Sequence, residues 1–204
     1  LKPTGDFVKV LDSVEVLGAP EGGGSFSLSE SGDLLYVTAA LWEEDRVVYV
    51  DRTGRAVRED SGWGGWIWGG VAVRSDGRTQ VASVMRRKRP PNLWVREAGQ
   101  GNPSELTSAQ NIDFYPAFIK GGSAVAFVGP RDGGNWDLYF VPVDGASKPA
   151  RVLDRPGDMV SFDITPDGRS VVFCEVGKSA DLGFHRFAPD TLTTMLLATP
   201  SNEC

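Results

Sequence analysis

Apolar and polar residues alternate along most of this chain, and the alternation belongs to a repeat. A polar turn that ends in glycine recurs four times, and the residues four and six positions before each glycine are apolar or proline. A spacing of two places both positions on one side of a half-buried strand. The turn glycines, which lie 45, 45 and 46 residues apart, are Gly32, Gly77, Gly122 and Gly168.

Three further strand-like segments follow each turn. The first is rich in β-branched and aromatic residues, and the last is the weakest. The middle segment carries an aromatic residue or a histidine at Tyr49, Trp94, Tyr139 and His185. Four strands in about 45 residues, repeated in tandem, is the arrangement of β-propeller blades. The predicted repeats span approximately residues 24–60, 69–109, 114–154 and 160–198.

The pattern predicts an all-β chain: a single domain over residues 1–204, built as a β-propeller with about four blades of four antiparallel strands each. Residues 8–17 read as one or two additional strands. Because the fourth repeat has its own last strand, these additional strands have no vacancy in a closed four-bladed ring. We therefore favour an open sector of a larger propeller, which predicts self-association through its uncovered blade edges.

Three stretches resemble the TolB-like β-propeller repeat, whose blades carry a Pro-Asp-Gly turn. They are ELTSAQNIDFYPAF at 105–118, DLYFVPVDG at 137–145 and ITPDGRSVVF at 164–173. More narrowly, SLSESGDLLYV at 27–37 with RVVYVDRTGR at 46–55 resembles propellers attached to bacterial serine/threonine kinases. The resemblance implies a protein partner and an extracytoplasmic location, in the periplasm or the cell envelope.

Composition narrows the range of partners. The 204-residue chain has a formal net charge of −6, which argues against nucleic acid because that ligand requires a clustered basic face. No apolar run approaches the length of a membrane-spanning helix, so no direct membrane insertion is expected. Cys174 and Cys204 have neither metal-ligand spacing nor the density of a disulfide scaffold. We expect a buried thiol at Cys174 and a mobile terminal residue at Cys204.

Sequence motifs for catalysis are missing. The chain has no nucleophile elbow, no P-loop and no dinucleotide-binding glycine motif. Its one histidine, His185, shares the aromatic position of the repeat, which indicates a packed strand residue. We expect Asp76 and Asp167, in the glycine turns, to bond their own backbone rather than a metal ion. The predictions are therefore no enzyme, no catalytic residue, no metal and no cofactor.

Three tryptophans lie in one predicted link between blades, SGWGGWIWGG at 61–70. Such links share one face of a propeller with the loops between second and third strands. The tryptophans either form an aromatic ledge for a peptide, a sugar or another protein, or fill the gap between the first two blades. Alternation lets Trp66 and Trp68 both face inward, which leaves Trp63 as the better surface candidate.

Two loops of the same face complete the candidate binding site. Residues 86–89 form a compact cationic tip, which either meets an acidic partner or an anionic ligand, or is a solvated loop. The loop at 129–137 adds an amide and an indole. The predicted binding residues are Trp63, Trp66, Trp68, Arg86, Arg87, Arg89, Asn135 and Trp136.

These observations predict a non-catalytic protein-interaction, scaffold or sensor module of TolB-like type. Two alternatives stay open. One is a propeller that gates substrate for a hydrolase domain elsewhere in a larger protein. The other is a propeller that binds a small ligand or a carbohydrate at its tryptophan-rich face. The repeat does not choose between them, because propellers host many unrelated functions.

Overall fold

The computed structural model describes residues 26–28, 34–37, 45–86, 89–108, 111–119, 121–131 and 134–204. Within these residues the chain forms sixteen β-strands and no helix, so no helix there is long and apolar enough to cross a membrane. The strands make four four-stranded antiparallel sheets, as predicted. The additional strands predicted at residues 8–17 lie outside the described residues, and the single domain over 1–204 stays a prediction.

Each sheet is one blade, and its strands follow one another in sequence order. Blade 1 contains β1 (Phe26–Leu28), β2 (Leu34–Val37), β3 (Val47–Val50) and β4 (Ala56–Asp60). Blade 2 contains β5 (Trp66–Val73), β6 (Thr79–Met85), β7 (Asn92–Glu97) and β8 (Ser104–Glu105). Blade 3 contains β9 (Phe114–Phe118), β10 (Ala124–Pro130), β11 (Trp136–Pro142) and β12 (Ala150–Leu153). Blade 4 contains β13 (Asp158–Ile164), β14 (Ser170–Val176), β15 (Ala180–Arg186) and β16 (Leu192–Leu197).

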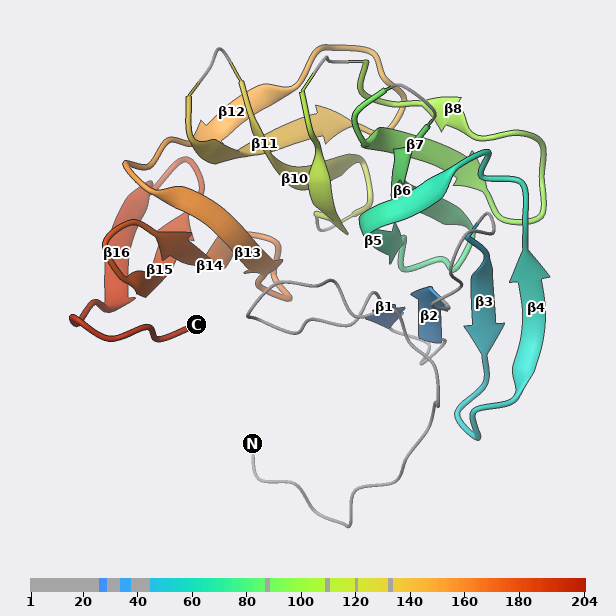
Figure 1. Ribbon diagram of the computed structural model, residues 1–204, viewed down its shortest axis with the longest axis horizontal. Coiled ribbons are helices and arrows are strands. Elements are labelled where there is room, and N and C mark those ends of the chain that lie inside the picture. The colour runs from blue at the N-terminus through green and yellow to red at the C-terminus, as the bar shows by residue number, and fades with distance from the viewer. Residues whose placement is uncertain are drawn as a thin grey trace.

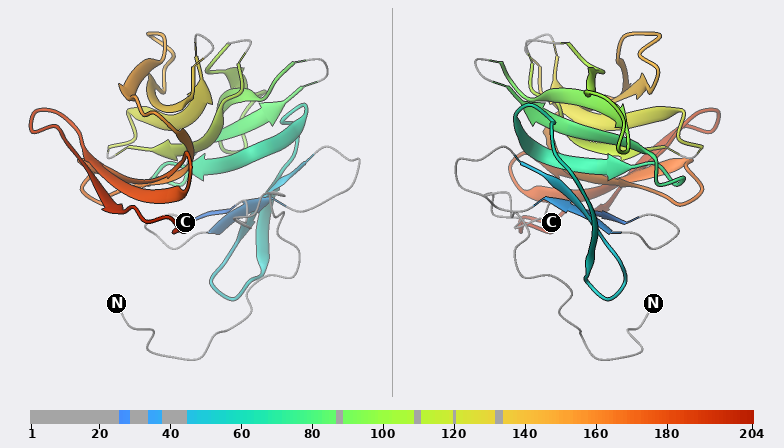
Figure 2. Two further views of the ribbon diagram at one scale, coloured as in Figure 1. Left: turned by 60° about the vertical axis from the view of Figure 1, so that its left-hand side comes forward. Right: turned by 90° about the vertical axis from the view of Figure 1, so that its right-hand side faces the viewer.

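The four blades stand side by side in an arc, with blade 1 and blade 4 at its two ends (Figure 1). The first strand of each blade contacts the first strand of the next, from β1 through β5 and β9 to β13. Figure 2 shows the same succession of blades from two sides. This arrangement follows from the sequence pattern, because a sheet with apolar side chains on both faces must cover both with neighbours.

The core consists of three apolar clusters, one at each junction between adjacent blades. Ala126 and Phe127 show how the clusters are divided. They are neighbours on β10 and both fully buried, yet Phe127 packs toward blade 2 and Ala126 toward blade 4. Successive side chains of a strand point to opposite faces, so blade 3 buries both of its faces between two other blades.

The three glycine turns that lie within the described residues have the geometry that the repeat predicts. Gly77 has a φ of 70°, in the left-handed region that glycine adopts without steric cost. In this turn the Oδ1 of Asp76 accepts the backbone N–H of Arg78 at 2.8 Å. In the fourth repeat the Oδ1 of Asp167 accepts the backbone N–H of Arg169 at 3.0 Å. The prediction that these aspartates bond their own backbone is confirmed.

The two cysteine predictions are wrong, because Cys174 and Cys204 form a disulfide with their Cα atoms 6.0 Å apart. Strand alternation turns Cys174 to the face of blade 4 opposite Phe173, which packs toward blade 3. The chain after β16 returns to β15, where the backbone N–H of Ala180 donates to the Oδ1 of Asn202 at 3.0 Å. This return joins segments that are distant in sequence, which no local pattern signals.

The disulfide should stabilise the last blade. We expect Cys204→Ser to lower the free energy of unfolding by about 2–4 kcal/mol, because the cross-link restricts the unfolded chain. Urea denaturation measures this loss. A reductant should destabilise the wild-type protein by a similar amount and leave the variant unchanged, while the exposed Ser201→Ala serves as the matched control. If the reductant leaves the stability of the wild-type protein unchanged, the result would contradict a disulfide between Cys174 and Cys204.

Candidate functional site

Strand β5 begins with two exposed tryptophans. Trp66 is 40% exposed and Trp68 is 48% exposed, whereas Ile67 between them is 1% exposed. The sequence pattern favours Trp63 as the surface residue and allows Trp66 and Trp68 to face inward. This prediction is wrong, since Trp63 is 1% exposed and lies in the cluster between blades 1 and 2. Alternation shows that Trp66 and Trp68 share a side, but it does not show which side faces the core.

A bulge with two glycines sets the direction of this strand end. The pairing of β5 with β6 shifts register between Ile67 and Val71. Gly69 and Gly70, inside the shift, have φ values of 93° and 107°, which favour glycine. A Cβ on Gly69 would lie 2.4 Å from the Cδ1 of Phe114. The bulge therefore lets β9 pack closely on β5 while the strand end turns its tryptophans outward.

The cationic tip begins next to these tryptophans, because Trp66 pairs with Met85 across the sheet and Arg86 follows. The guanidinium carbon of Arg86 lies 3.4 Å from the ring centroid of Trp94. Its Nη2 donates to the backbone carbonyl of Trp63 at 3.1 Å. Arg86 thus binds the link between blades 1 and 2 to blade 2. It also places a positive charge in a fixed position at the start of the cationic tip.

Arg89 ends the cationic tip on the surface. Its backbone N–H donates to the carbonyl of Arg86 at 2.9 Å, which turns the loop back on itself. Its Nη2 lies 2.7 Å from the Oε1 of Glu105, in a pair whose side chains are 48% and 25% exposed. An exposed pair of this kind contributes little stability, so Arg89 can exchange its partner. Arg87, also predicted as a binding residue, lies outside the described residues.

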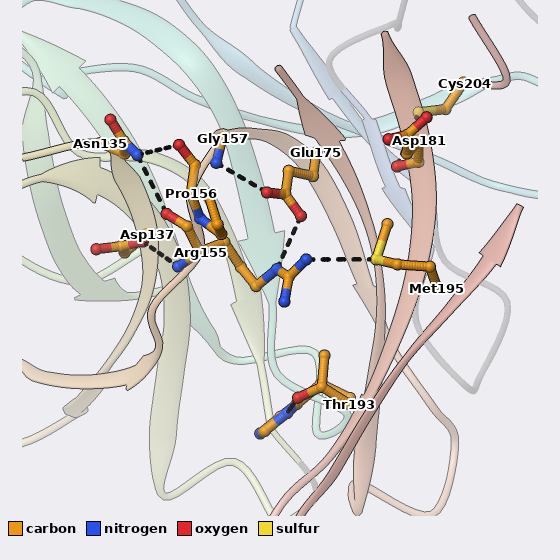
Figure 3. A network of polar contacts seen from close by, with 11 residues as sticks. Asn135, Asp137, Arg155, Pro156, Gly157, Glu175, Asp181, Thr193, Met195 and Cys204 are labelled. Carbon is orange, nitrogen blue, oxygen red and sulfur yellow. Dashed lines mark hydrogen bonds and ion pairs between the residues drawn. The ribbon is translucent and has the colours of Figure 1, made fainter. Parts of the chain in front are cut away.

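The last two predicted binding residues lie at the junction of blades 3 and 4. The amide of Asn135 donates to the backbone carbonyls of Arg155 and Pro156, in the link between these blades (Figure 3). Trp136 is half-buried, with its ring centroid 5.3 Å from that of Phe114. The structure therefore places Trp66 and Trp68 at the end of blade 2 where the cationic tip begins, and gives Asn135 a role in joining two blades.

Sequence reasoning missed an ionic network at the same junction, drawn in Figure 3. The backbone N–H of Arg155 donates to Asp137 at 3.1 Å, and its Nε donates to Glu175 at 2.8 Å. Glu175 also accepts the backbone N–H of Gly157 at 2.8 Å. The available signal was Glu175 itself, because a carboxylate inside the apolar strand SVVFCEV requires a buried partner.

His185 is a packed strand residue, as predicted. It is 4% exposed, its Nδ1 lies 2.7 Å from the Oγ1 of Thr193, and its ring meets that of Phe187 edge-on. Burial, together with the positive charge of Arg155, lowers the pKa of His185. Among the residues that the structure describes, no cluster of histidine, cysteine, aspartate and glutamate has the composition of a metal site.

Hollows open between the blades and at the ends of their first strands. One, of about 570 Å³, lies between blades 2 and 3. Another, of about 360 Å³, lies where the first strands of the blades end, and Arg74 and Asp163 are among its lining residues. The Nε of Arg74 donates to Asp76 at 2.8 Å, which lowers the pKa of Asp76. The charges at this second hollow are therefore partly neutralised within the protein.

No protein-family model and no curated protein sequence matches the chain, but solved structures share its fold. TolB from Acinetobacter baumannii has 17% sequence identity and a TM-score of 0.68, over 84% of this chain and 42% of that one. A putative TolB from Agrobacterium tumefaciens has 16% identity and a TM-score of 0.71, over 88% and 69% of the two chains. A puromycin-hydrolysing peptidase from Mycobacterium tuberculosis has 14% identity and a TM-score of 0.62, over 83% and 30%. The chain thus has the β-propeller fold of TolB-like proteins, and spans less than half of the first of them.

The prediction that the chain is not an enzyme is overturned by these comparisons. Structures with the same fold include the puromycin-hydrolysing peptidase and an oligogalacturonate lyase. The prediction failed because a search for a few sequence motifs does not cover the chemistries that loops of a propeller and additional domains supply. At these identities the likeness shows the fold alone, and it assigns no activity to this chain.

Burial separates the tryptophans by their expected effect on stability. Trp63→Ala should lower the free energy of unfolding by about 3–5 kcal/mol, because it opens a cavity between blades 1 and 2. Trp66→Ala and Trp68→Ala should each change it by less than about 1 kcal/mol, because their rings are partly in water. Urea denaturation of the three variants measures this order. A larger loss for Trp66→Ala than for Trp63→Ala would contradict the packing described here.

Proposed function

We propose that this chain is a protein-binding propeller module that holds an acidic, extended segment of a partner protein. The binding site is the Trp–Arg surface, formed by Trp66, Trp68, Arg86 and Arg89. The observation that carries the proposal is the pair of exposed tryptophans at the start of β5, next to a run of four cations. Tryptophan and arginine are the residue types that dominate the energetic centres of protein interfaces.

The tryptophans provide the apolar part of the Trp–Arg surface. Both rings lie on one side of β5 and are partly in contact with water, at 40% and 48% exposure. Covering apolar area contributes roughly 25 cal/mol per Å², and an indole ring is the largest such group that a side chain offers. Because buried Ile67 anchors the strand between them, Trp66 and Trp68 are held in place before a partner arrives.

Charge supports an acidic partner. The chain as a whole carries a net charge of −6, while residues 86–89 are four consecutive cations. Such a local reversal of sign attracts an acidic segment and sets its orientation. The exposed pair between Arg89 and Glu105 can give way to a carboxylate of the partner, because exposed ion pairs contribute little on their own.

The fold and the disulfide fit this proposal. The fold shared with TolB suits a protein partner, and a disulfide such as Cys174–Cys204 is typical of oxidising compartments. Both support the extracytoplasmic location that the sequence resemblance implies, which thiol alkylation of the protein in intact cells would test. A kinase-linked sensor would be one setting for such a module, although it rests on the sequence resemblance alone.

A second candidate is the propeller part of a larger hydrolase. The observation that favours it is the likeness to the puromycin-hydrolysing peptidase, of which this chain covers 30%. The Trp–Arg surface would then face the substrate or a second domain. Two results together would favour this candidate over the first. The full-length protein would hydrolyse amides at a rate that Trp66→Ala lowers, and it would not bind acidic peptides.

Short synthetic peptides test the proposed function. We expect short acidic peptides to bind, and peptides of inverted charge to bind far more weakly. Trp66→Ala and Trp68→Ala should each weaken binding by about tenfold or more, as loss of an interface hot spot does. Fluorescence anisotropy of labelled peptides measures the affinities, and added salt should lower them.

Leu192→Ala is the matched control, because Leu192 is exposed to a similar degree, at 51%, but lies on β16, in the blade at one end of the arc. It should leave peptide affinity unchanged. Equal binding of acidic and basic peptides would contradict the proposal. So would binding of oligosaccharides that depends on Trp66 and Trp68 when acidic peptides do not bind at all.

A further inference from the structure

The cavity of about 570 Å³ between blades 2 and 3 shares no residue with the Trp–Arg surface. Its volume is typical of pockets for small molecules, which span roughly 300–1,000 Å³. The lining residues from the end of blade 2 are Thr107 and Ser108, and those from blade 3 are Arg131, Tyr139, Lys148, Pro149 and Arg151. Of these seven lining residues, which are those that the structure describes, three are cations and none is an acid.

Arg131 is fixed at this cavity by a buried carboxylate. Its Nη2 pairs with Asp113, which is 0% exposed, and Asp113 also accepts the hydroxyl of Thr107 at 2.6 Å. The Nη1 of Arg131 donates to the carbonyl of Pro130 at 3.0 Å. A guanidinium has five N–H groups, so these two bonds orient Arg131 and leave further donors for a ligand.

The arginine next to the repeated tyrosine takes a different position in blades 1 and 3. Tyr49 in blade 1 and Tyr139 in blade 3 each stand opposite an arginine on the next strand. In blade 1 the guanidinium of Arg58 lies 3.6 Å from the ring centroid of Tyr49 and covers it. In blade 3 Arg151 is drawn instead to Asp137 at 3.3 Å and to Asp154 at 3.2 Å. Tyr139 lines the cavity with little exposed area, at 4%, and the guanidinium carbon of Arg131 lies 5.1 Å from its ring centroid.

Lys148 completes the set of cations. Asp113 balances Arg131, and Asp137 balances Arg151 together with the exposed Asp154. Lys148 is exposed and forms no hydrogen bond or ion pair within the described part of the chain. Its ammonium group sits on a flexible stem that can close over a ligand. The cavity thus has two oriented guanidinium groups and one positive charge without a partner.

We propose that this cavity binds a small organic anion, through one carboxylate or phosphate group held by Arg131, Lys148 and Arg151. Guanidinium groups form paired hydrogen bonds with carboxylates and phosphates. Pro149 and the exposed edge of Tyr139 give the remainder of the ligand an apolar wall, and Ser108 offers it a hydroxyl. This site is independent of the proposed protein partner, so either proposal can fail without the other.

Titration of isotope-labelled protein with citrate and with inorganic phosphate tests the site by NMR. We expect saturable shifts of the backbone amides of Thr107, Ser108 and Arg151. Lys148→Glu should weaken binding about tenfold or more, because it replaces a charge-assisted hydrogen bond by repulsion. Lys178→Glu makes the same charge change at an exposed lysine of blade 4, and it should leave the affinity within about twofold.

The probes distinguish the two anion chemistries. Saturation by citrate alone assigns the site to carboxylates, and saturation by phosphate alone assigns it to phosphates. Lys148→Ala leaves the arginine pairs intact, so it controls for a loss of binding that is caused by misfolding. It should weaken binding less than Lys148→Glu. The proposal is overturned if neither probe gives saturable shifts, or if Lys178→Glu weakens binding as much as Lys148→Glu.

Discussion

Each blade of this protein has apolar side chains on both faces, and a sheet of that kind is stable only when both faces are covered. Adjacent blades meet this requirement by packing on one another in three clusters. An arginine–carboxylate pair accompanies every described junction: Arg96–Asp60, Arg131–Asp113 and Arg155–Glu175. Breaking one partner of such a buried pair leaves an uncompensated charge, so these pairs constrain how neighbouring blades align.

The same requirement explains the two features that depart from the repeat. At the end of the arc, blade 4 has no fifth sheet among the described residues, and the segment that ends at Cys204 returns to it and is held by the disulfide with Cys174. Between blades 1 and 2, the link places the whole indole of Trp63 in the core. The next strand keeps Ile67 in the same cluster, and its glycine bulge turns Trp66 and Trp68 toward the solvent.

The sequence was most informative where its signal is periodic or local. Alternation and the spacing of glycines predicted the strands and blades, and an aspartate before a turn glycine, as at Asp76, predicted its own bond to the backbone. It was least informative where contacts join distant segments. The outward side of Trp66, the return of Cys204 to Cys174 and the partner of Glu175 all depend on how one blade lies against another. Residue patterns within a single blade do not contain that information.

Native-state hydrogen exchange tests most directly whether neighbouring blades stabilise one another. Strands β6, β10 and β14 hold the same place in their blades, but β14 belongs to the end of the arc. We predict slower exchange in β6 and β10 than in β14, because both faces of their blades are covered by neighbours. A reductant should speed exchange in β14 alone. Equal protection of all three strands, unchanged by the reductant, would contradict this prediction.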